Sequence, residues 1–396
     1  MARLSTSRSR AFNCLAPEVP PLSKKIVLSA NSDWNIANFR AGLIRGLRGA
    51  GYEPVVMAPQ DTHVGARIRE LGVEQISVSI DRSGVNPLAD LRLLAEYRRV
   101  LKRLRPAAYL GYTIKPNIYG SYAAASLGIA AFPNVSGLGT AFIRNGLLQQ
   151  LVTSLYRIGF RRAPVVFFQN DEDRELFTRR RIIRPDQARV LPGSGVDLAR
   201  FTAVRPASGP PVFLFVGRLL RDKGVVEFLD AARSLRDVLP DARFQLLGQF
   251  DEGNRTAISR SEVESWVSNG DVEYLGTTDD VRPAIAASSA VVLPSYREGL
   301  PRSLLEAGAM SRPLVATDVP GCRDVVEDGI NGYLCAVRDA RSLAAAMRRM
   351  AELPQPARLA MGKAARRKIQ DEFSEERVIS AYLEALEGST KVQAGS

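Results

Sequence analysis

The chain alternates short apolar runs with segments whose apolar residues recur at helical spacing. Two runs rich in Val and Ile, 24–30 and 52–59, flank a segment at 38–51 that has the helical spacing and stops at glycine. This order of strand, helix and strand predicts a parallel sheet with right-handed crossovers. Further strands of this half are expected at 107–112, 163–169 and 188–192.

A stretch rich in Gly, Pro and Ser, 191–212, interrupts the alternation and is the best linker in the chain. After it the pattern restarts, with strands expected at 212–217, 242–248, 272–276, 290–294, 313–317 and 332–335. Two such series predict an α/β protein with two Rossmann-like domains whose parallel sheets face each other across a cleft. Because ligands of such sheets bind beyond the carboxyl ends of the strands, we expect the loops there to carry the chemistry.

Length fits this division. The 396 residues are too many for one hydrophobic core and predict two domains of roughly 200 residues each. We assign 24–200 to an N-terminal domain and 201–371 to a C-terminal domain, and we expect 1–23 to be a disordered tail.

Cysteine usage and apolar runs bear on the compartment. Cys14, Cys322 and Cys335 are too widely spaced for a disulfide framework or a CxxC metal clip, which favours a reducing cytosol. The first residues lack the continuous apolar core of a signal peptide, and no apolar run is long enough to span a bilayer. We therefore expect a cytoplasmic protein without a transmembrane segment.

Positive charge is concentrated in one interval. The formal net charge is +12, yet no Asp or Glu occurs between Glu96 and Asp171. The cations in that interval are Arg98, Arg99, Lys102, Arg103, Arg105, Lys115, Arg144, Arg157, Arg161 and Arg162. Nucleic acid would be attracted by such charge, but no recognisable nucleic-acid module accompanies it, so we expect no nucleic-acid partner. A merely solvated basic face is the plain alternative to the interpretation that we favour, an anionic membrane surface or a phosphate-bearing substrate.

The segment 142–163 lies within the same interval and combines apolar residues at helical spacing with arginines and no acid. Such a helix can lie in a membrane interface, where each Lys or Arg adds about 1 kcal/mol on an anionic leaflet. A buried core helix with an exposed basic edge fits the pattern equally well, and both interpretations stay open.

The most informative motif is SYREGLPRSLLEAGAM, 295–310, which follows the strand expected at 290–294. Pro301 suits the first position of a helix, so Glu298 falls on the preceding loop and Glu306 within the helix. Free amides at a helix start bind anions, and a carboxylate beside them can accept hydrogen bonds from sugar hydroxyls. A capping glutamate plus an exposed helical one is the plain alternative. A paired-carboxylate glycosidase stays open too, because sequence spacing does not define the roughly 5–9 Å between carboxyl groups that it needs.

A second motif, VGRLLRDKGVVEFL at 216–229, ends a strand with Gly217 and offers Arg218 and Lys223 before a helix. Glycine allows close approach of the backbone to a ligand, and two cations can hold one diphosphate. The alternative is a plain turn with two solvated cations.

Metal chemistry has little support. Asp171 and Asp173 have a spacing that can hold a divalent metal, but helix capping by Asn170 or Asp171 explains the segment better. The single histidine, His63, argues against multi-histidine metal sites and a Ser-His-Asp triad. We expect neither a metal nor a cofactor.

Three loops of the N-terminal half are candidates to face the diphosphate site. They are SANSDWNIANF (29–39), GYTIKPNIYGS (111–121) and NVSGLGTAF (134–142), and each is weak evidence by itself. The first lacks a GxGxxG signature, which argues against a dinucleotide-binding oxidoreductase. The candidates that they supply are Asn31, Trp34, Asn35, Lys115, Asn117, Gly137 and Gly139.

Together these motifs resemble the retaining glycosyltransferases of the GT-B fold, family four. Residues 295–334 are similar to the E-x7-E region of that family, VGRLLRDKG to its diphosphate-binding turn, and PGSGVDLARF (192–201) to its interdomain segment. The N-terminal loops resemble a bacterial subgroup that extends lipid-linked glycans, often with N-acetylated amino sugars. The resemblance runs from about Lys24 to Tyr382. With it we expect a C-terminal helix, at about 372–388, that returns to the N-terminal domain.

The resemblance implies roles for particular residues. Glu298 would contact donor-sugar hydroxyls and Glu306 the ribose, while Arg218 and Lys223 would hold the diphosphate. Also in the donor-binding set are Gly217 and the helix start at Gly299, Leu300 and Pro301. The acceptor-binding set is Asn31, Trp34, Asn35, Asn117, Gly137 and Gly139.

Many relatives carry a histidine of the N-terminal domain near the donor sugar. This sequence has Tyr112, Thr113 and Lys115 in that region instead, and we expect Lys115 to face the reacting carbon.

The implied reaction is the metal-independent, retaining transfer of an N-acetylhexosamine or hexose from a UDP-sugar to a polyprenyl-diphosphate-linked or other glycan. The resemblance places it in cell-surface polysaccharide synthesis, on the inner face of the cytoplasmic membrane as a peripheral protein. A non-catalytic protein that binds nucleotide-sugar or membrane is the alternative.

Overall fold

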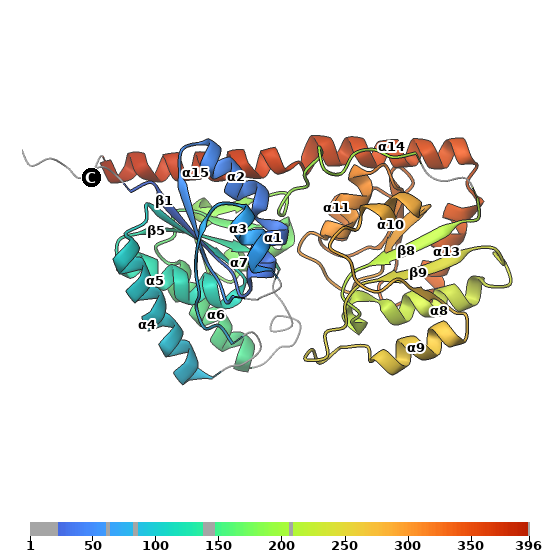
Figure 1. The fold of residues 1–396 in the computed structure, drawn as a ribbon, viewed down its shortest axis with the longest axis horizontal. Helices are drawn as coiled ribbons and strands as arrows, with labels where there is room; N and C mark the ends of the chain where they lie inside the picture. The colour runs from blue at the N-terminus through green and yellow to red at the C-terminus, as the bar shows by residue number, and fades with distance from the viewer. Residues whose placement is uncertain (1–22, 61–63, 82–85, 138–146, 206–208, 395–396) are drawn as a thin grey trace, which may run out of the picture.

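The computed structural model describes residues 23–60, 64–81, 86–137, 147–205 and 209–394. Two α/β domains lie side by side, and two long helices, α14 (Gln355–Glu372) and α15 (Glu375–Ala394), run along one side of both (Figure 1). This architecture confirms the predicted fold class of two facing domains with parallel sheets.

The N-terminal domain is built on a seven-stranded parallel sheet in the order β3-β2-β1-β4-β5-β6-β7. Its strands are β1 (Lys25–Ser29), β2 (Glu53–Met57), β3 (Glu74–Ile76), β4 (Ala108–Tyr112), β5 (Ala130–Val135), β6 (Val166–Phe168) and β7 (Ala188–Val190). The central strands are buried on both faces, which explains why they read as continuous apolar runs.

Helices cover both faces of this sheet. They are α1 (Asp33–Phe39), α2 (Ala41–Gly49), α3 (Gly65–Glu70), α4 (Pro87–Leu104), the π-helical turn η1 (Pro116–Gly120), α5 (Ser121–Ser126), α6 (Leu147–Phe160), α7 (Asp171–Arg179) and the short turn η3 (Pro185–Gln187). Helices α1, α2, α3 and α15 share one core with the sheet, and α4, α5 and α6 pack on the opposite face.

The C-terminal domain has a six-stranded parallel sheet in the order β10-β9-β8-β11-β12-β13 and a single continuous core. Its strands are β8 (Val212–Val216), β9 (Arg243–Leu247), β10 (Glu273–Tyr274), β11 (Ala290–Leu293), β12 (Leu314–Thr317) and β13 (Gly332–Cys335). Its helices, besides α14, are the short turn η4 (Arg221–Lys223), α8 (Val225–Leu235), α9 (Arg260–Ser268), α10 (Arg282–Ala287), α11 (Arg302–Ala309), α12 (Cys322–Val325) and α13 (Ala340–Glu352).

The chain crosses between the domains twice at one place. The Val196 amide donates to the Phe373 carbonyl at 3.0 Å, and the Glu375 amide donates to the Val196 carbonyl at 3.1 Å. Gly195 has φ +69, and a Cβ there would lie 2.6 Å from the Glu375 Cα, so only glycine fits. The two crossings are therefore paired like neighbouring strands.

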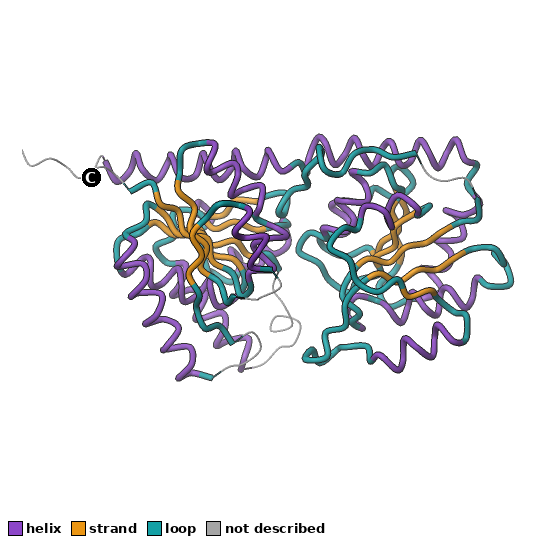
Figure 2. Tube along the Cα trace, in the orientation of Figure 1, coloured by secondary structure: helices purple, strands orange, loops and turns teal. Residues whose placement is uncertain are grey.

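Helix α15 completes the N-terminal domain. It packs on α2 and adds Val378, Tyr382 and Leu386 to the core of that domain, while α14 packs on α11 (Figure 2). The expected return of a C-terminal helix is confirmed.

Two details differ from the sequence prediction. The single helix expected at 38–51 is broken at Arg40, whose backbone leaves the helical region and whose guanidinium lies 4.0 Å from the centre of the Tyr112 ring. Strand β5 was missed because it contains Pro133, and proline is unusual in a central strand. The edge strand β3 was also missed, being only three residues long.

Candidate functional site

Two loops of the C-terminal domain meet beyond the carboxyl ends of β8 and β11. The Lys223 Nζ lies 2.5 Å from Glu298 Oε1, and the Tyr296 amide donates to the Asp222 carbonyl at 2.9 Å. Between them, Gly224 has φ +73, and a Cβ there would lie 2.1 Å from the Pro294 carbonyl oxygen. Since no side chain fits, this glycine brings the two predicted motifs into one site.

Arg218 does not join the Lys223–Glu298 pair. It follows Gly217 at the end of β8 and forms an ion pair with Asp251, at 2.7 Å, from the loop after β9. Both predicted diphosphate cations thus have a carboxylate partner, and both are partly open to solvent.

Helix α11 carries Glu306. It begins at Arg302 with Pro301 as its N-cap, one residue later than predicted, because Pro301 has an extended ψ of 110°. Glu306 is nearly buried and pairs with Arg302 at 2.6 Å. Burial raises the pKa of the Glu306 carboxyl above its ordinary value, and Arg302 opposes that rise.

The turn at Gly299 and Leu300 is packed against the backbone of two other chain segments, 136–137 and the region of Gly321. A Cβ on Gly299 would lie 2.4 Å from the Ser136 carbonyl oxygen, and a Cβ on Gly137 would be 3.9 Å from the Gly299 amide. A Cβ on Gly321 would lie 2.4 Å from the Gly299 carbonyl oxygen. The predicted Gly137 therefore faces the predicted donor turn from the other domain.

The segment weighed as a metal site lies against the other domain. Asn170 caps α7, as expected, because its Oδ1 accepts from the Asp173 amide at 2.8 Å, and its Nδ2 donates to the Gly299 carbonyl at 2.9 Å. The Asp173 carboxylate is bonded to Arg297. In the parts of the chain that the structure describes, no group of three or more His, Cys, Asp or Glu is arranged to hold a metal ion.

The first strand-to-helix turn contains three of the predicted acceptor residues. The Asn31 amide donates to Thr113 Oγ1 at 3.1 Å, and the Asn35 amide to Ser32 Oγ at 3.2 Å. Trp34 is 43% exposed and makes an edge-to-face contact with Phe39. Thr113 has φ +66, a strained conformation for a β-branched residue, at the end of β4.

The second N-terminal loop holds its polar side chains inward. Lys115 Nζ lies 2.8 Å from Asp90 Oδ1, and both side chains are mostly buried. Asn117 is buried, and its Nδ2 donates to the Asn134 carbonyl at 2.7 Å. Their functional roles stay predictions. Gly139 lies outside the described residues.

A cavity of about 550 Å³ opens beyond the ends of β9 and β10 and was missed by the sequence analysis. Its lining includes Gln249, Phe250, Arg260, Tyr274 and Thr277. Phe250 stacks edge-on with Tyr274, and Arg260 lies over Phe250. The signal that could have found it is the pair of glycines, at 248 and 276, that follow these strands.

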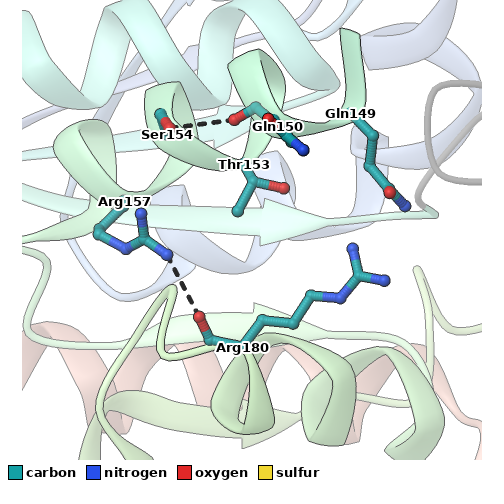
Figure 3. Close-up of a pocket in the computed structure, with 6 residues that line it drawn as sticks. All are labelled: Gln149, Gln150, Thr153, Ser154, Arg157 and Arg180. Atoms are coloured by element: carbon teal, nitrogen blue, oxygen red, sulfur yellow. Dashed lines mark hydrogen bonds between the residues drawn. The ribbon is translucent and has the colours of Figure 1, made fainter. Parts of the chain in front are cut away.

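A second hollow, of about 370 Å³, lies between α6 and the end of α7 (Figure 3). Polar residues of α6 line one side, and Arg157 and Arg180 bring positive charge to it. Arg157 also donates to the Arg180 carbonyl at 3.3 Å. Helix α6 buries Val152 and Phe160 in the core, whereas Leu151 and Ile158 are more than half exposed. Association of this helix with a membrane stays a prediction.

None of the helices within the described ranges is both long and apolar enough to cross a bilayer.

Comparison with known proteins agrees with this geometry. A family model for a "Glycosyl transferase 4-like domain" matches residues 36–193, and one for "Glycosyl transferases group 1" matches 210–352. The N,N'-diacetylbacillosaminyl-diphospho-undecaprenol alpha-1,3-N-acetylgalactosaminyltransferase of Campylobacter jejuni is 30% identical over 327 residues, covering 78% of this chain and 84% of that protein. The UDP-Gal:alpha-D-GlcNAc-diphosphoundecaprenol alpha-1,3-galactosyltransferase of Escherichia coli is 23% identical, covering 68% and 72%.

Among solved structures, HepE of Anabaena in complex with UDP and glucose matches with a TM-score of 0.76 at 17% identity, over 92% of this chain and 99% of that one. The fold and the paired loops define a glycosyltransferase of the GT-B type. The chain belongs to family four of these enzymes. The comparisons do not support the alternative of a non-catalytic binding protein.

Proposed function

We propose that this protein is a retaining, metal-independent hexosyltransferase. It moves an N-acetylhexosamine or hexose from a UDP-sugar to a polyprenyl-diphosphate-linked or other glycan in cell-surface polysaccharide synthesis. The observation that carries the proposal is the Lys223–Glu298 pair beside the start of α11, opposite the glycine-bearing end of β5. Two relatives support the substrate classes: both are named for undecaprenol-diphosphate-linked acceptors, and the name of the Escherichia coli enzyme also states UDP-galactose as donor.

Donor binding exchanges the partners of the charged groups. Without donor, Lys223 is neutralised by Glu298, and Arg218 by Asp251. A bound diphosphate replaces Glu298 as the partner of Lys223, since phosphate oxygens are strong acceptors for an ammonium group. Glu298 is then released to accept hydrogen bonds from hydroxyls of the sugar. Glu306 binds the ribose, and the cavity beside Phe250 receives the base.

Bond breaking develops negative charge on the departing diphosphate. Lys223, Arg218 and the amides at Gly299 and Leu300 stabilise that charge at the start of α11 without requiring a metal. The bond from the anomeric carbon to the phosphate oxygen breaks while a bond to the acceptor oxygen forms on the same face. The acceptor proton passes to the leaving phosphate, so no protein base is required. Lys115 faces the reacting carbon in this proposal, which requires it to leave Asp90.

The acceptor lies against the N-terminal domain, whose boundary we place near residue 200. Trp34 is exposed there and offers a flat apolar surface to a sugar ring. The exposed Leu151 and Ile158 of α6, together with Arg157 and Arg161, give that domain an amphipathic surface for the inner face of an anionic membrane.

The test is to incubate the protein with a panel of UDP-sugars and a lipid-linked acceptor, and to measure release of UDP and the anomeric configuration of the product. Acceptor-dependent release with retained configuration is expected, at an undiminished rate in EDTA. UDP binding without any transfer would contradict catalysis of this reaction. An inverted configuration of the product would contradict the proposed attack on the same face of the sugar. A strict requirement for Mg²⁺ would contradict the proposed metal independence.

A further inference from the structure

We propose that Asn170 and Asp173, at the start of α7, are positioning residues for sugar transfer. From the N-terminal domain they hold the turn 297–300, which carries Glu298 and the amides of the donor site. The inference rests on the proposed function, because it concerns the same donor turn.

Asn170 holds two elements with one side-chain amide. Its oxygen accepts from the Asp173 amide at 2.8 Å and so caps α7, while its nitrogen donates to the Gly299 carbonyl at 2.9 Å. The cap orients the side chain that reaches across to the other domain. The carbonyl that it binds belongs to the residue immediately after Glu298.

Asp173 binds the residue immediately before Glu298, which is Arg297. Its carboxylate is 1% exposed and bonded to the Arg297 guanidinium. Burial raises the pKa of Asp173, while Arg297 and Asn170 lower it. A buried carboxylate depends on its cation, so the position of Arg297 is tightly restrained. We call the Asn170–Gly299 and Asp173–Arg297 contacts together the cross-domain clamp.

The turn is also closely packed against the backbone of both domains. Gly299 fits between the Ser136 carbonyl and the backbone at Gly321, where no Cβ is tolerated. Glu298 is therefore held on both sides by groups that the N-terminal domain supplies. The position of Glu298 in the donor site of the C-terminal domain therefore depends on contact with the N-terminal domain.

A neighbouring contact provides a matched control. Glu172 pairs with Arg323 across the same domain boundary at 3.2 Å, but both side chains are at least 40% exposed. Water and salt screen such a pair, and it touches neither Glu298 nor Gly299. Glu172→Gln therefore changes a cross-domain charge without removing either contact of the clamp.

The clamp predicts separate effects on catalysis and on donor binding. The nucleoside cavity and the diphosphate cations belong to the C-terminal domain alone. Displacement of Glu298 by about 1 Å can cost a hundredfold in rate. We therefore expect Asp173→Asn to lower kcat by about tenfold to a hundredfold. The Kd for UDP should rise by a much smaller factor, because of its proposed contacts only the amides at Gly299 and Leu300 lie on the turn.

A double variant separates positioning from stability. In Asp173→Asn the Arg297 charge has lost its partner, so the melting temperature should fall. Asp173→Asn combined with Arg297→Gln removes both charges, so the melting temperature should recover while kcat stays low. Wild-type kcat in the double variant, or a rise in the Kd for UDP as large as the fall in kcat, would overturn the proposal.

A measurement without substrate tests the clamp apart from the proposed function. Amide hydrogen exchange of a peptide covering 295–301 should be faster in Asp173→Asn than in wild type and unchanged in Glu172→Gln. Equal exchange in all three proteins would show that the clamp does not hold the turn. If the wild type transfers no sugar but exchange responds as expected, the proposed function fails while the clamp stands.

Discussion

The two domains present contrasting groups to each other. On the C-terminal side every predicted charged residue has an opposite charge close by, as in the pairs Lys223–Glu298, Arg218–Asp251 and Glu306–Arg302. On the N-terminal side the predicted acceptor residues are held mainly by neutral hydrogen bonds, as between Asn31 and Thr113 and between Asn117 and Asn134. Lys115, which was predicted to face the reacting carbon rather than to bind the acceptor, is a charged candidate on this side, with Asp90 as its partner.

This difference matches what each side binds in the proposed reaction. A diphosphate has constant charge and shape, so a rigid set of paired charges can recognise it and exchange partners with it. An acceptor glycan presents neutral hydroxyls, which neutral amides and an exposed indole recognise without desolvating a charge. The following experiments act on the two sides in turn.

The largest effect is expected from Lys223→Ala on the C-terminal side. Removal of the cation leaves the departing diphosphate without its ammonium partner and leaves Glu298 unpaired. We expect kcat/KM for transfer to fall by about two to three orders of magnitude with the fold preserved. Steady-state kinetics and circular dichroism check this. Lys363→Ala, an exposed lysine on α14, is the control and should behave as wild type. Comparable activity in both variants would remove Lys223 from the site.

Glu306→Gln should weaken UDP binding by about tenfold, because a charged acceptor of the ribose hydroxyls is replaced by a neutral one. Burial raises the pKa of Glu306, so its proton binds at a higher pH than that of an ordinary glutamate. Wild-type affinity for UDP should therefore decline as the pH falls through that raised pKa, whereas the variant should lack this decline. Calorimetric titration with UDP at several pH values measures both. An equal pH profile in both proteins would contradict the assignment of Glu306, and Glu264→Gln, which changes an exposed glutamate on α9, is the control.

On the N-terminal side, Thr113→Val should have a smaller effect. It removes the hydroxyl that accepts from the Asn31 amide, which should lower the free energy of unfolding by about 1 kcal/mol. The KM for acceptor should rise while the Kd for UDP stays constant, because the turn with Asn31 and Trp34 loses a support. Thr113→Ser keeps the hydroxyl and should restore the KM. If the KM for acceptor stays raised in Thr113→Ser, the effect comes from the strained backbone at position 113 and not from the hydroxyl.

The smallest effect is expected from Ile158→Ser on α6. We expect binding to vesicles of anionic lipid to weaken a few-fold, with catalysis on a soluble acceptor analogue unchanged. Liposome flotation at low salt measures it. Leu91→Ser on α4, an exposed leucine on another helix, is the control. No flotation of the wild type would remove the membrane surface from the proposal.

The loops of the C-terminal candidate site could be predicted from the sequence more easily than the cross-domain contacts, for a physical reason. Glycines and charged residues in loops after apolar strands indicate a candidate ligand site locally, and such loops gave the prediction of Lys223 and Glu298. Their contact spans 75 positions, and that between Asp173 and Arg297 spans 124, so no local pattern could join them. The capping role of Asn170 was predicted, but its second bond was not. The contact of Arg40 with the Tyr112 ring also joins segments far apart in the sequence and was equally inaccessible to a local pattern.

The return of α15 to the first domain reverses the order in which the domains can be finished during translation. The seven-stranded sheet leaves the ribosome first, yet one helix of its core follows the entire second domain in the chain. The C-terminal domain can close its own core as soon as α14 has emerged, whereas the N-terminal domain keeps an apolar groove open until Val378, Tyr382 and Leu386 arrive. The domain that is synthesised first is completed last, and until then the apolar residues that α15 covers are exposed on the nascent chain, where they can bind a chaperone.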